Sequence, residues 1–342
     1  MVLQVRALRR TFPSIQVRHA GMAIATALAI ATLAFLPVTA HAAALNVCPS
    51  GCPFATIQAA ISAAQSGAMI AVAPGTYSGG VTVSQNVTLV GSGTALTTIQ
   101  GGGPVVLIPA GVTVSIRDIT ITGGNVVGRG GGIANYGTLS VRDVIVNANF
   151  ASISGGGIAN FGSITVLSSV ISGNQAAVNG GGFLGFSGVS TISDTAVSGN
   201  QAGFAGGGIA GSVTLSNSNV VGNTAANGGG MAAQSPATVI GTTIANNRAT
   251  SFGGGVVTVN AFDLENSTVT GNLAQNGGGI AFIGSLSISN SAIAANTATE
   301  EGGGIFLAAS LGAGTATLTE STVSQNIPDN CFPPGSISGC KG

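Results

Sequence analysis

The chain has 342 residues, of which only 18 are charged, nine basic and nine acidic, and 56 are glycine. So few charges exclude a chain kept disordered by its charge, and glycine without a Gly-X-Y period excludes collagen. Because no basic excess is present to neutralise phosphates, we expect no nucleic-acid partner.

The first segment, residues 1–44, is typical of a secretory signal peptide. It carries four arginines and no acid within 1–20, then an uncharged apolar run over 22–36, then small residues over 40–44. This order of basic, apolar and A-x-A segments marks a peptide that is cleaved on export. The alternative is an uncleaved membrane anchor, for which the run is short against the ~20 residues that a spanning helix needs. We therefore expect export and no membrane span in the mature protein.

Cleavage would change the inventory of reactive side chains. Both histidines, His19 and His41, would leave with the signal peptide. The mature chain would then lack the commonest general base and metal ligand, so we expect no metal and no cofactor. Its basic residues would be Arg117, Arg129, Arg142, Arg248 and Lys341.

Residues 45–67 predict a cap at the start of the mature chain. Within 54–64, apolar residues recur on one face of a short helix, and they are Ile57, Ala60, Ile61 and Ala64. Apolar strands are then expected at 69–73, 81–83 and 87–90. A helix over the open end of a solenoid would shield the core and strand edges of the first coil.

A period of about 25 residues governs the coils, residues 68–326. A Gly-Gly-Gly triplet followed by an apolar residue occurs eight times, with spacings of 22 to 26 residues. The apolar residues are Ile133, Ile158, Phe183, Ile209, Met231, Val256, Ile280 and Ile305. Asparagines precede the triplets, and a ninth closes the series: Asn125, Asn149, Asn174, Asn200, Asn223, Asn247, Asn272, Asn296 and Asn326. We expect these asparagines to form a hydrogen-bonded ladder between coils.

Two apolar columns precede the asparagines from Asn149 onward. The residues eight and three positions earlier are aliphatic in all sixteen cases, from Val141 and Val146 to Leu318 and Val323. The columns are five residues apart, so one continuous strand would point them to opposite faces. Polar residues between them predict a corner that turns both columns to one interior.

Two short strands and two or three corners per period describe a coil of a parallel β-helix. The fold class is therefore all-β, a single-stranded solenoid of about ten coils, ~50 Å long at the usual strand spacing. Helical repeats are excluded because each triplet would break a helix. A calcium-binding β-roll is excluded because no triplet is followed by aspartate.

Residues 327–342 are expected to close the last coil. Four cysteines, Cys48 and Cys52 near one end and Cys331 and Cys340 near the other, are an even number in an exported chain. This pattern favours disulfides over a zinc site built from all four thiolates. Since a rod would hold the two pairs at opposite ends, we predict the local bonds Cys48–Cys52 and Cys331–Cys340.

Three stretches carry a family resemblance that covers residues 45–342. The segment ATIQAAISAAQSGAMIAVAPGTYSGGVTVSQNVTLVGSG, at 55–93, resembles the opening of right-handed parallel β-helix proteins of the pectin-lyase-like superfamily. The Gly-Gly-Gly-Ile and asparagine repeats resemble those of polymorphic-outer-membrane-type proteins, and PDNCFPPGSISGC, at 328–340, resembles the closing segment of secreted members. The resemblance implies a right-handed β-helix. It implies no single activity, because the superfamily holds lyases, hydrolases, epimerases and adhesins.

By that resemblance, lyases would use acidic calcium ligands with an arginine or lysine base, and hydrolases would use clustered aspartates. The best candidate cluster is Arg117, Asp118, Arg142 and Asp143, one period apart. In adjacent coils the two carboxylates could lie ~5 Å apart, as in a retaining glycosidase. A surface ion-pair lattice explains the same four residues, and we favour it.

Tyr136, Phe161 and Phe186 each lie three residues after a post-triplet apolar residue, so they should stack on successive coils. They would form either a platform for sugar rings or an internal aromatic ladder, and we favour the ladder.

The function that fits best is a non-catalytic secreted or cell-surface protein that presents its sheet faces to polysaccharide or to another surface. The alternative is a polysaccharide-active enzyme, either a pectate-lyase-like lyase or a glycoside hydrolase, and only the lyase would need calcium. A structural component of the cell envelope is a third possibility. The sequence leaves the ligand and the oligomeric state open.

Overall fold

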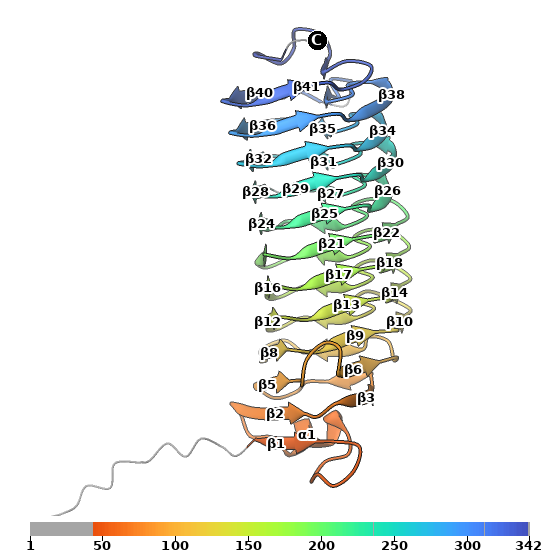
Figure 1. The fold of residues 1–342 in the computed structure, drawn as a ribbon, viewed down its shortest axis with the longest axis vertical. Helices are drawn as coiled ribbons and strands as arrows, with labels where there is room; N and C mark the ends of the chain where they lie inside the picture. Colours follow the sequence, from red (N-terminus) through yellow and green to blue (C-terminus); the bar gives the residue numbers. More distant parts are fainter. Residues whose placement is uncertain (1–43, 235, 311, 341–342) are drawn as a thin grey trace, which may run out of the picture. The chain divides into compact units, whose positions relative to one another are not determined.

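The computed structural model describes residues 44–234, 236–310 and 312–340. The predicted signal peptide lies outside the described residues except for Ala44. The described residues belong to one compact unit, a parallel β-helix with one short helix, α1 (Ile57–Ala63) (Figure 1). The predicted fold class, all-β and right-handed, is confirmed.

The strands stack into four parallel sheets, which we call A to D. Among the described residues, sheet A contains β1 (Leu45–Val47), β2 (Ala68–Val72), β5 (Val87–Val90), β8 (Thr113–Arg117), β12 (Thr138–Arg142), β16 (Ser163–Leu167), β20 (Ser190–Ser193), β24 (Thr214–Ser216), β28 (Ala237–Ile240), β32 (Phe262–Glu265), β36 (Gly284–Ser289) and β40 (Gly314–Thr319). Sheet B contains β3 (Gly75–Ser78), β6 (Thr97–Gln100), β9 (Thr120–Thr122), β13 (Ile145–Asn147), β17 (Val170–Ser172), β21 (Ala196–Ser198), β25 (Asn219–Val221), β29 (Thr243–Ala245), β33 (Thr268–Thr270), β37 (Ala292–Ala294) and β41 (Thr322–Ser324).

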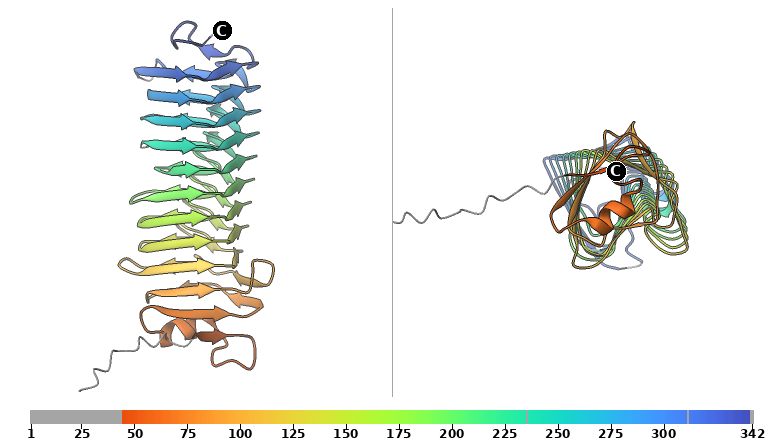
Figure 2. Two further views of the ribbon diagram at one scale, coloured as in Figure 1. Left: turned by 60° about the vertical axis from the view of Figure 1, so that its left-hand side comes forward. Right: turned by 90° about the horizontal axis from the view of Figure 1, so that it is seen from below.

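Sheet C contains β4 (Val81–Thr82), β7 (Val106–Ile108), β11 (Ile133–Asn135), β15 (Ile158–Asn160), β19 (Phe183–Gly185), β23 (Ile209–Gly211), β27 (Met231–Ala233), β31 (Val256–Thr258), β35 (Ile280–Phe282), β39 (Ile305–Leu307) and β42 (Cys331–Phe332). Sheet D contains β10 (Asn125–Val126), β14 (Phe150–Ala151), β18 (Gln175–Ala176), β22 (Gln201–Ala202), β26 (Thr224–Asn227), β30 (Arg248–Phe252), β34 (Leu273–Asn276) and β38 (Thr297–Glu301). From β10 to β38, each coil visits sheets A, B, D and C in turn, and Figure 2 shows the coils superimposed end-on.

The core fills the space between the sheets, as the two apolar columns predict. Fourteen of the sixteen column residues are buried, and only those of the last coil, Leu318 and Val323, are half-buried. The predicted corner lies between the columns, where the backbone has positive φ in nine successive coils. The residues there are Asp118, Asp143, Ser168, Asp194, Asn217, Gly241, Asn266, Asn290 and Glu320. Most of them are Asp, Asn or Gly, which adopt this left-handed conformation at the lowest cost.

The asparagine ladder runs along the inside of the coil stack from Asn149 to Asn326. The side-chain amide of each asparagine donates to Oδ1 of the next at 2.9–3.0 Å, and its backbone N–H donates to the same atom. Each amide also donates to a core-strand carbonyl, as Asn223 Nδ2 does to Val197 O at 2.9 Å. The ladder thus satisfies polar groups that a buried corner would otherwise leave unpaired.

The prediction that Asn125 belongs to the ladder is wrong. Asn125 is exposed in β10 and is the register partner of Phe150, and the ladder position in its coil is Gly124, whose N–H donates to Asn149 Oδ1. The spacing explains the error, because Asn125 precedes Asn149 by 24 residues whereas the register there requires 25. At the other end the ladder continues to Asn330, whose Oδ1 accepts from Asn326 Nδ2.

The two ends of the solenoid are covered differently. Helix α1 buries Ile57 and Ile61 against the first coil, and Thr56 Oγ1 caps it by accepting from Ala59 N–H at 3.2 Å. At the other end, β42 pairs with β39 and Ile337 is buried in the core. The predicted disulfides Cys48–Cys52 and Cys331–Cys340 are both present, so the cysteines do not form a zinc site.

Candidate binding faces

The predicted charged cluster lies at the corner between sheets A and B. Arg117 and Arg142 are register partners in β8 and β12, so Asp118 and Asp143 follow on neighbouring coils. Each arginine pairs with the aspartate next to it, Arg117 with Asp118 at 3.0 Å and Arg142 with Asp143 at 3.1 Å. All four side chains are at least one-third exposed, which is the setting of surface ion pairs.

Other carboxylates do not join this cluster. Asp194 occupies the same corner column, but the coil that carries Ser168 separates it from Asp143. Glu300 accepts hydrogen bonds from Gln275 and Asn276 several coils away. Among the described residues, no group of three or more His, Cys, Asp or Glu side chains is placed to hold a metal ion.

The outer face of sheet A carries a column of hydroxyls that the sequence analysis missed. One outward position per strand, in continuous register from β5 to β40, is serine or threonine in nine of ten coils. This hydroxyl column consists of Thr88, Ser115, Ser140, Thr165, Thr191, Thr214, Thr238, Asp263, Ser287 and Thr317. The signal was available in the sequence, because these residues share the 25-residue period of the core. From Ser140 onward, each lies one position before a member of the inward apolar column that runs from Val141 to Leu318.

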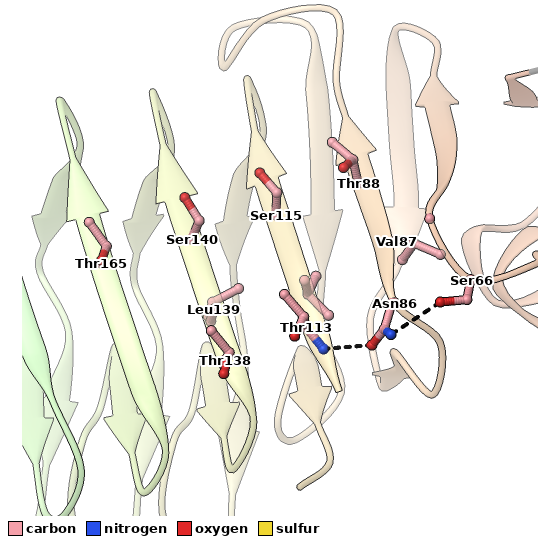
Figure 3. A pocket seen from close by; sticks show the side chains of 12 residues that line it. Ser66, Asn86, Val87, Thr88, Thr113, Ser115, Thr138, Leu139, Ser140 and Thr165 are labelled. Atoms are coloured by element: carbon pink, nitrogen blue, oxygen red, sulfur yellow. Dashed lines mark hydrogen bonds between the residues drawn. The ribbon is translucent and has the colours of Figure 1, made fainter. Parts of the chain in front are cut away.

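A shallow hollow of about 650 Å³ lies over the first four members of this column (Figure 3). Its rim includes Asn86, whose Oδ1 accepts from Thr113 N–H at 2.8 Å and whose Nδ2 donates to Ser66 Oγ at 3.1 Å. Serine, threonine and asparagine predominate among the twelve described residues that line it, and none of the twelve is ionisable. The hollow therefore offers many hydrogen-bonding groups and no acid, base or charged nucleophile of its own.

The predicted aromatic stack forms on the outside of the coils. The rings of Tyr136 and Phe161 are 4.8 Å apart and nearly parallel, and Phe186 follows at 5.3 Å. Tyr136 and Phe186 are 45 % and 61 % exposed, so the favoured internal ladder is wrong. The alternation of side chains along a strand explains this. A residue three positions after an inward apolar residue, here Ile133, Ile158 or Phe183, must point outward.

The stack is also a poor platform for sugars. Phe161 lies between the rings of Tyr136 and Phe186, which belong to the preceding and the following coil. The guanidinium carbon of Arg129 lies 5.9 Å from the ring centre of Phe161 and 5.3 Å from that of Phe186. The rings therefore turn much of their faces to one another and to a cation.

The coils, corners and ladder define a right-handed parallel β-helix protein. No protein-family model and no curated protein matches the sequence. No helix in the described part of the chain has the length and apolar character needed to cross a membrane.

Solved structures similar to the chain include three proteins. The pectin methylesterase from Aspergillus niger is 15 % identical over 88 % of this chain and 91 % of its own, with a TM-score of 0.41. The pectate lyase Pel9A is 13 % identical over 82 % and 79 %, with a TM-score of 0.48. The A-module of the mannuronan C-5 epimerase AlgE6 from Azotobacter vinelandii is 18 % identical over 79 % and 95 %, with a TM-score of 0.40. At such identities the likeness carries no activity over to this chain.

Proposed function

We propose that this protein is a non-catalytic extracellular or cell-surface protein that binds a polysaccharide along the outer face of sheet A. The hydroxyl column is the observation that carries the proposal. Its members repeat at one per coil, ~4.8 Å apart, in a straight row along the stack. Each hydroxyl can both donate and accept a hydrogen bond, which suits a ligand whose own surface is hydroxyls and ring oxygens.

The surroundings of the column favour binding without catalysis. The lining of the hollow holds no ionisable side chain among its described residues, so acid–base chemistry there would have to come from the ligand or from outside the hollow. The many weak contacts of an extended face suit a long polymer, whose successive units can engage successive coils.

Three features support the proposed location. Disulfides persist in oxidising compartments, and the chain has two. The resemblance of the glycine repeats to polymorphic-outer-membrane-type proteins, and the predicted signal peptide, point to the same side of the membrane.

A glycan array tests this proposal with three proteins: wild type, Ser140→Ala combined with Thr165→Val, and the control Thr268→Val combined with Thr270→Val on the outer face of sheet B. We expect wild type and the control to bind the same polysaccharides and the sheet A variant to lose at least about fivefold in affinity, roughly 1 kcal/mol. Failure of wild type to bind any polysaccharide, or equal binding by the sheet A variant, would overturn the proposal.

A polysaccharide-active enzyme is the second candidate, because the charged cluster borders the hollow. Arg117 and Arg142 end the strands β8 and β12, whose Ser115 and Ser140 line it. Catalysis would then require Asp118 and Asp143 to act together on a sugar bound across their two coils, and the lyase form would add calcium.

A further inference from the structure

The outer face of sheet C differs from that of sheet A because its own chain covers it. Outward residues of its strands, such as Ala159, Leu184 and Ala210, are buried. On one side lies a wall that we call the lip, made of residues at the ends of the sheet D strands or just after them: Ile153, Val178, Phe204, Asn227 and Phe252. The opposite wall, which we call the far wall, is the column that follows sheet C: Tyr136, Phe161, Phe186, Ser212, Gln234, Val259, Ile283 and Ala308.

The protein's own side chains fill this trough at both ends. At the N-terminal end, Phe161 packs with Leu184 over Ala159 and Ala210. At the C-terminal end, Phe306 stacks between Phe252 and Phe332, with ring centroids about 6 Å apart. Both ends are therefore closed by large apolar side chains.

Between these ends the trough is open. Its floor there is built from Ala232, Val257 and Ala281, which are register partners in β27, β31 and β35, and small side chains leave a cavity of about 430 Å³. On the far wall the open part runs through three coil steps, from Gln234 to Ala308, so its length is ~14 Å at the usual strand spacing. A straight axial trough of this kind fits an unbranched chain.

The lining of the open part is mainly apolar. Phe204, Phe252, Val259 and Ile283 form its sides, and none of its fourteen described lining residues is ionisable. Its buried hydroxyl is already engaged, because Thr258 Oγ1 donates to Asn260 O at 3.3 Å. Backbone N–H and C=O groups of sheet C pair between coils, so an extended peptide could not add to them. The side-chain amides of Asn227 and Gln234 are the other polar side chains of the lining, so an occupant would bind mainly through apolar contact.

A cation lies just beyond the N-terminal end of the open part. Arg129 is exposed, and its guanidinium lies 5.3 Å from the ring centre of Phe186. Phe186 is one coil, ~4.8 Å, before the coil of Ser212 and Phe204. Among the described residues, no carboxylate lies within ion-pair distance of Arg129. An unneutralised positive charge thus lies over Phe161, one of the side chains that close the N-terminal end of the trough.

We infer that the open trough over sheet C binds a single-chain anionic amphiphile, a long-chain carboxylate, with its tail between the lip and the far wall and its carboxylate at Arg129. Apolar length and a cation at one end are the two halves of such a ligand. The site lies on a different sheet from the hydroxyl column, so it does not depend on the proposed polysaccharide function.

Titration calorimetry with dodecanoate and with dodecanol, both below their aggregation limits, tests this inference. We expect one dodecanoate per chain. Phe204→Ala and Val259→Asn should each weaken both ligands at least about fivefold, whereas Leu96→Ala, an equally exposed apolar residue outside the trough, should change neither. Since Phe204 and Val259 are about half exposed, both variants should keep the wild-type melting temperature.

The head group is tested separately. Arg129→Gln should weaken dodecanoate about fivefold and leave dodecanol unchanged, whereas Arg142→Gln, at the corner of sheets A and B, should affect neither ligand. The inference is overturned if wild type shows no saturable dodecanoate binding, or if Leu96→Ala weakens it as much as Phe204→Ala does. It is also overturned if Arg129→Gln alters both ligands equally or neither.

Discussion

Within each glycine triplet the three residues are required for different reasons. The first residue has positive φ, for example 66° at Gly206, which disfavours a side chain. The second and third have no such φ, but they pack directly on the next coil. A Cβ on Gly207 would overlap the carbonyl oxygens of Gly229 and Thr224. Backbone contact between coils, as well as conformation, therefore fixes the triplet.

The steric role predicts that Gly207→Val destabilises the protein strongly, by about 3 kcal/mol or more, because the carbonyls it meets belong to a rigid neighbouring coil. Thermal unfolding checks this, with Gly173→Asn as the control. Gly173 has φ of 60° and open space around it, and Asn246 occupies the same column in another coil, so that variant should melt within about two degrees of wild type. An unchanged melting temperature for Gly207→Val would contradict this, because it would show that the triplet accommodates a side chain at this position.

In the middle of the ladder, Asn223→Leu should cost about 2–5 kcal/mol. It removes the acceptor of Asn200 N–H and Nδ2 and the donor to Val197 O, and leaves these groups buried without partners. Denaturant unfolding measures the loss, and Asn219→Ala on the outer face of sheet B should be nearly neutral. Comparable losses in the two variants would contradict a special role for the ladder.

Burial raises the pKa of Tyr77, whose hydroxyl donates to Ala73 O at 2.9 Å. Because the raised pKa belongs to the folded state, the unfolded chain releases this proton first as the pH rises through 10. The contribution of the protonated Tyr77 side chain to the free energy of unfolding is therefore complete below pH ~10 and is lost progressively above it. We expect wild type to lose more stability than Tyr77→Phe between pH 9 and 11 in paired unfolding experiments. Equal losses of stability in the two proteins would show that ionisation of Tyr77 does not cause the loss at high pH.

At this scale the sequence identified residues better than it identified their orientation. The ladder from Asn149 onward follows from spacing alone, whereas Asn125 fails because its coil is one residue out of step. The sequence indicated Asp118 and Asp143 as a candidate pair of catalytic carboxylates. Their corner column also holds asparagine, glycine and serine in the same left-handed conformation. That shared φ is a structural reason for aspartate, and it can be recognised only when all coils are aligned.

Among the elements, those at the C-terminal end, with the closing segment 327–342, are expected to have the lowest local stability. Its strand β42 extends only sheet C, so the last strands of sheets A and B, β40 and β41, have a coil on one side only. Their inward residues are correspondingly half-buried. Local opening of this end should therefore need less free energy than unfolding of the whole stack.

Removing the second disulfide should expose this difference. In Cys331→Ser combined with Cys340→Ser, we expect amide exchange to accelerate in β40, β41 and β42 while the central coils keep wild-type protection. Hydrogen exchange measured by mass spectrometry resolves the two regions. Acceleration spread evenly over all coils would mean that the disulfide supports global stability instead.

The elements of sheets A, B and C follow from the apolar columns and the residue after each triplet, but sheet D does not. Its first strands, such as β10 and β14, are two residues long and present no alternating apolar pattern. They form because the coil above offers them backbone partners in register, and no local sequence signal marks them.

At the scale of the whole molecule, the stack turns a weak periodic signal into continuous surfaces. One serine or threonine per 25 residues means little in one strand, yet exact stacking places nine of them in a single row on sheet A. The same stacking brings few carboxylates together, because carboxylates on neighbouring coils seldom occupy the same register position. Among the described residues, Asp118 and Asp143 are the carboxylates that share this position on neighbouring coils, so any catalysis would depend on them.

The corner chemistry makes that dependence testable without disturbing the fold. Asn217, Asn266 and Asn290 occupy the column of Asp143 with nearly the same φ, so Asp143→Asn should leave the melting temperature almost unchanged, as should the control Asp194→Asn. We predict that wild type cleaves neither uronate nor neutral polysaccharides, with calcium or with a chelator present. The assays follow ultraviolet absorbance from unsaturated products and the appearance of new reducing ends. If wild type produces either signal, and Asp143→Asn abolishes it while Asp194→Asn does not, the protein is an enzyme that acts through the paired aspartates, and the non-catalytic proposal is wrong.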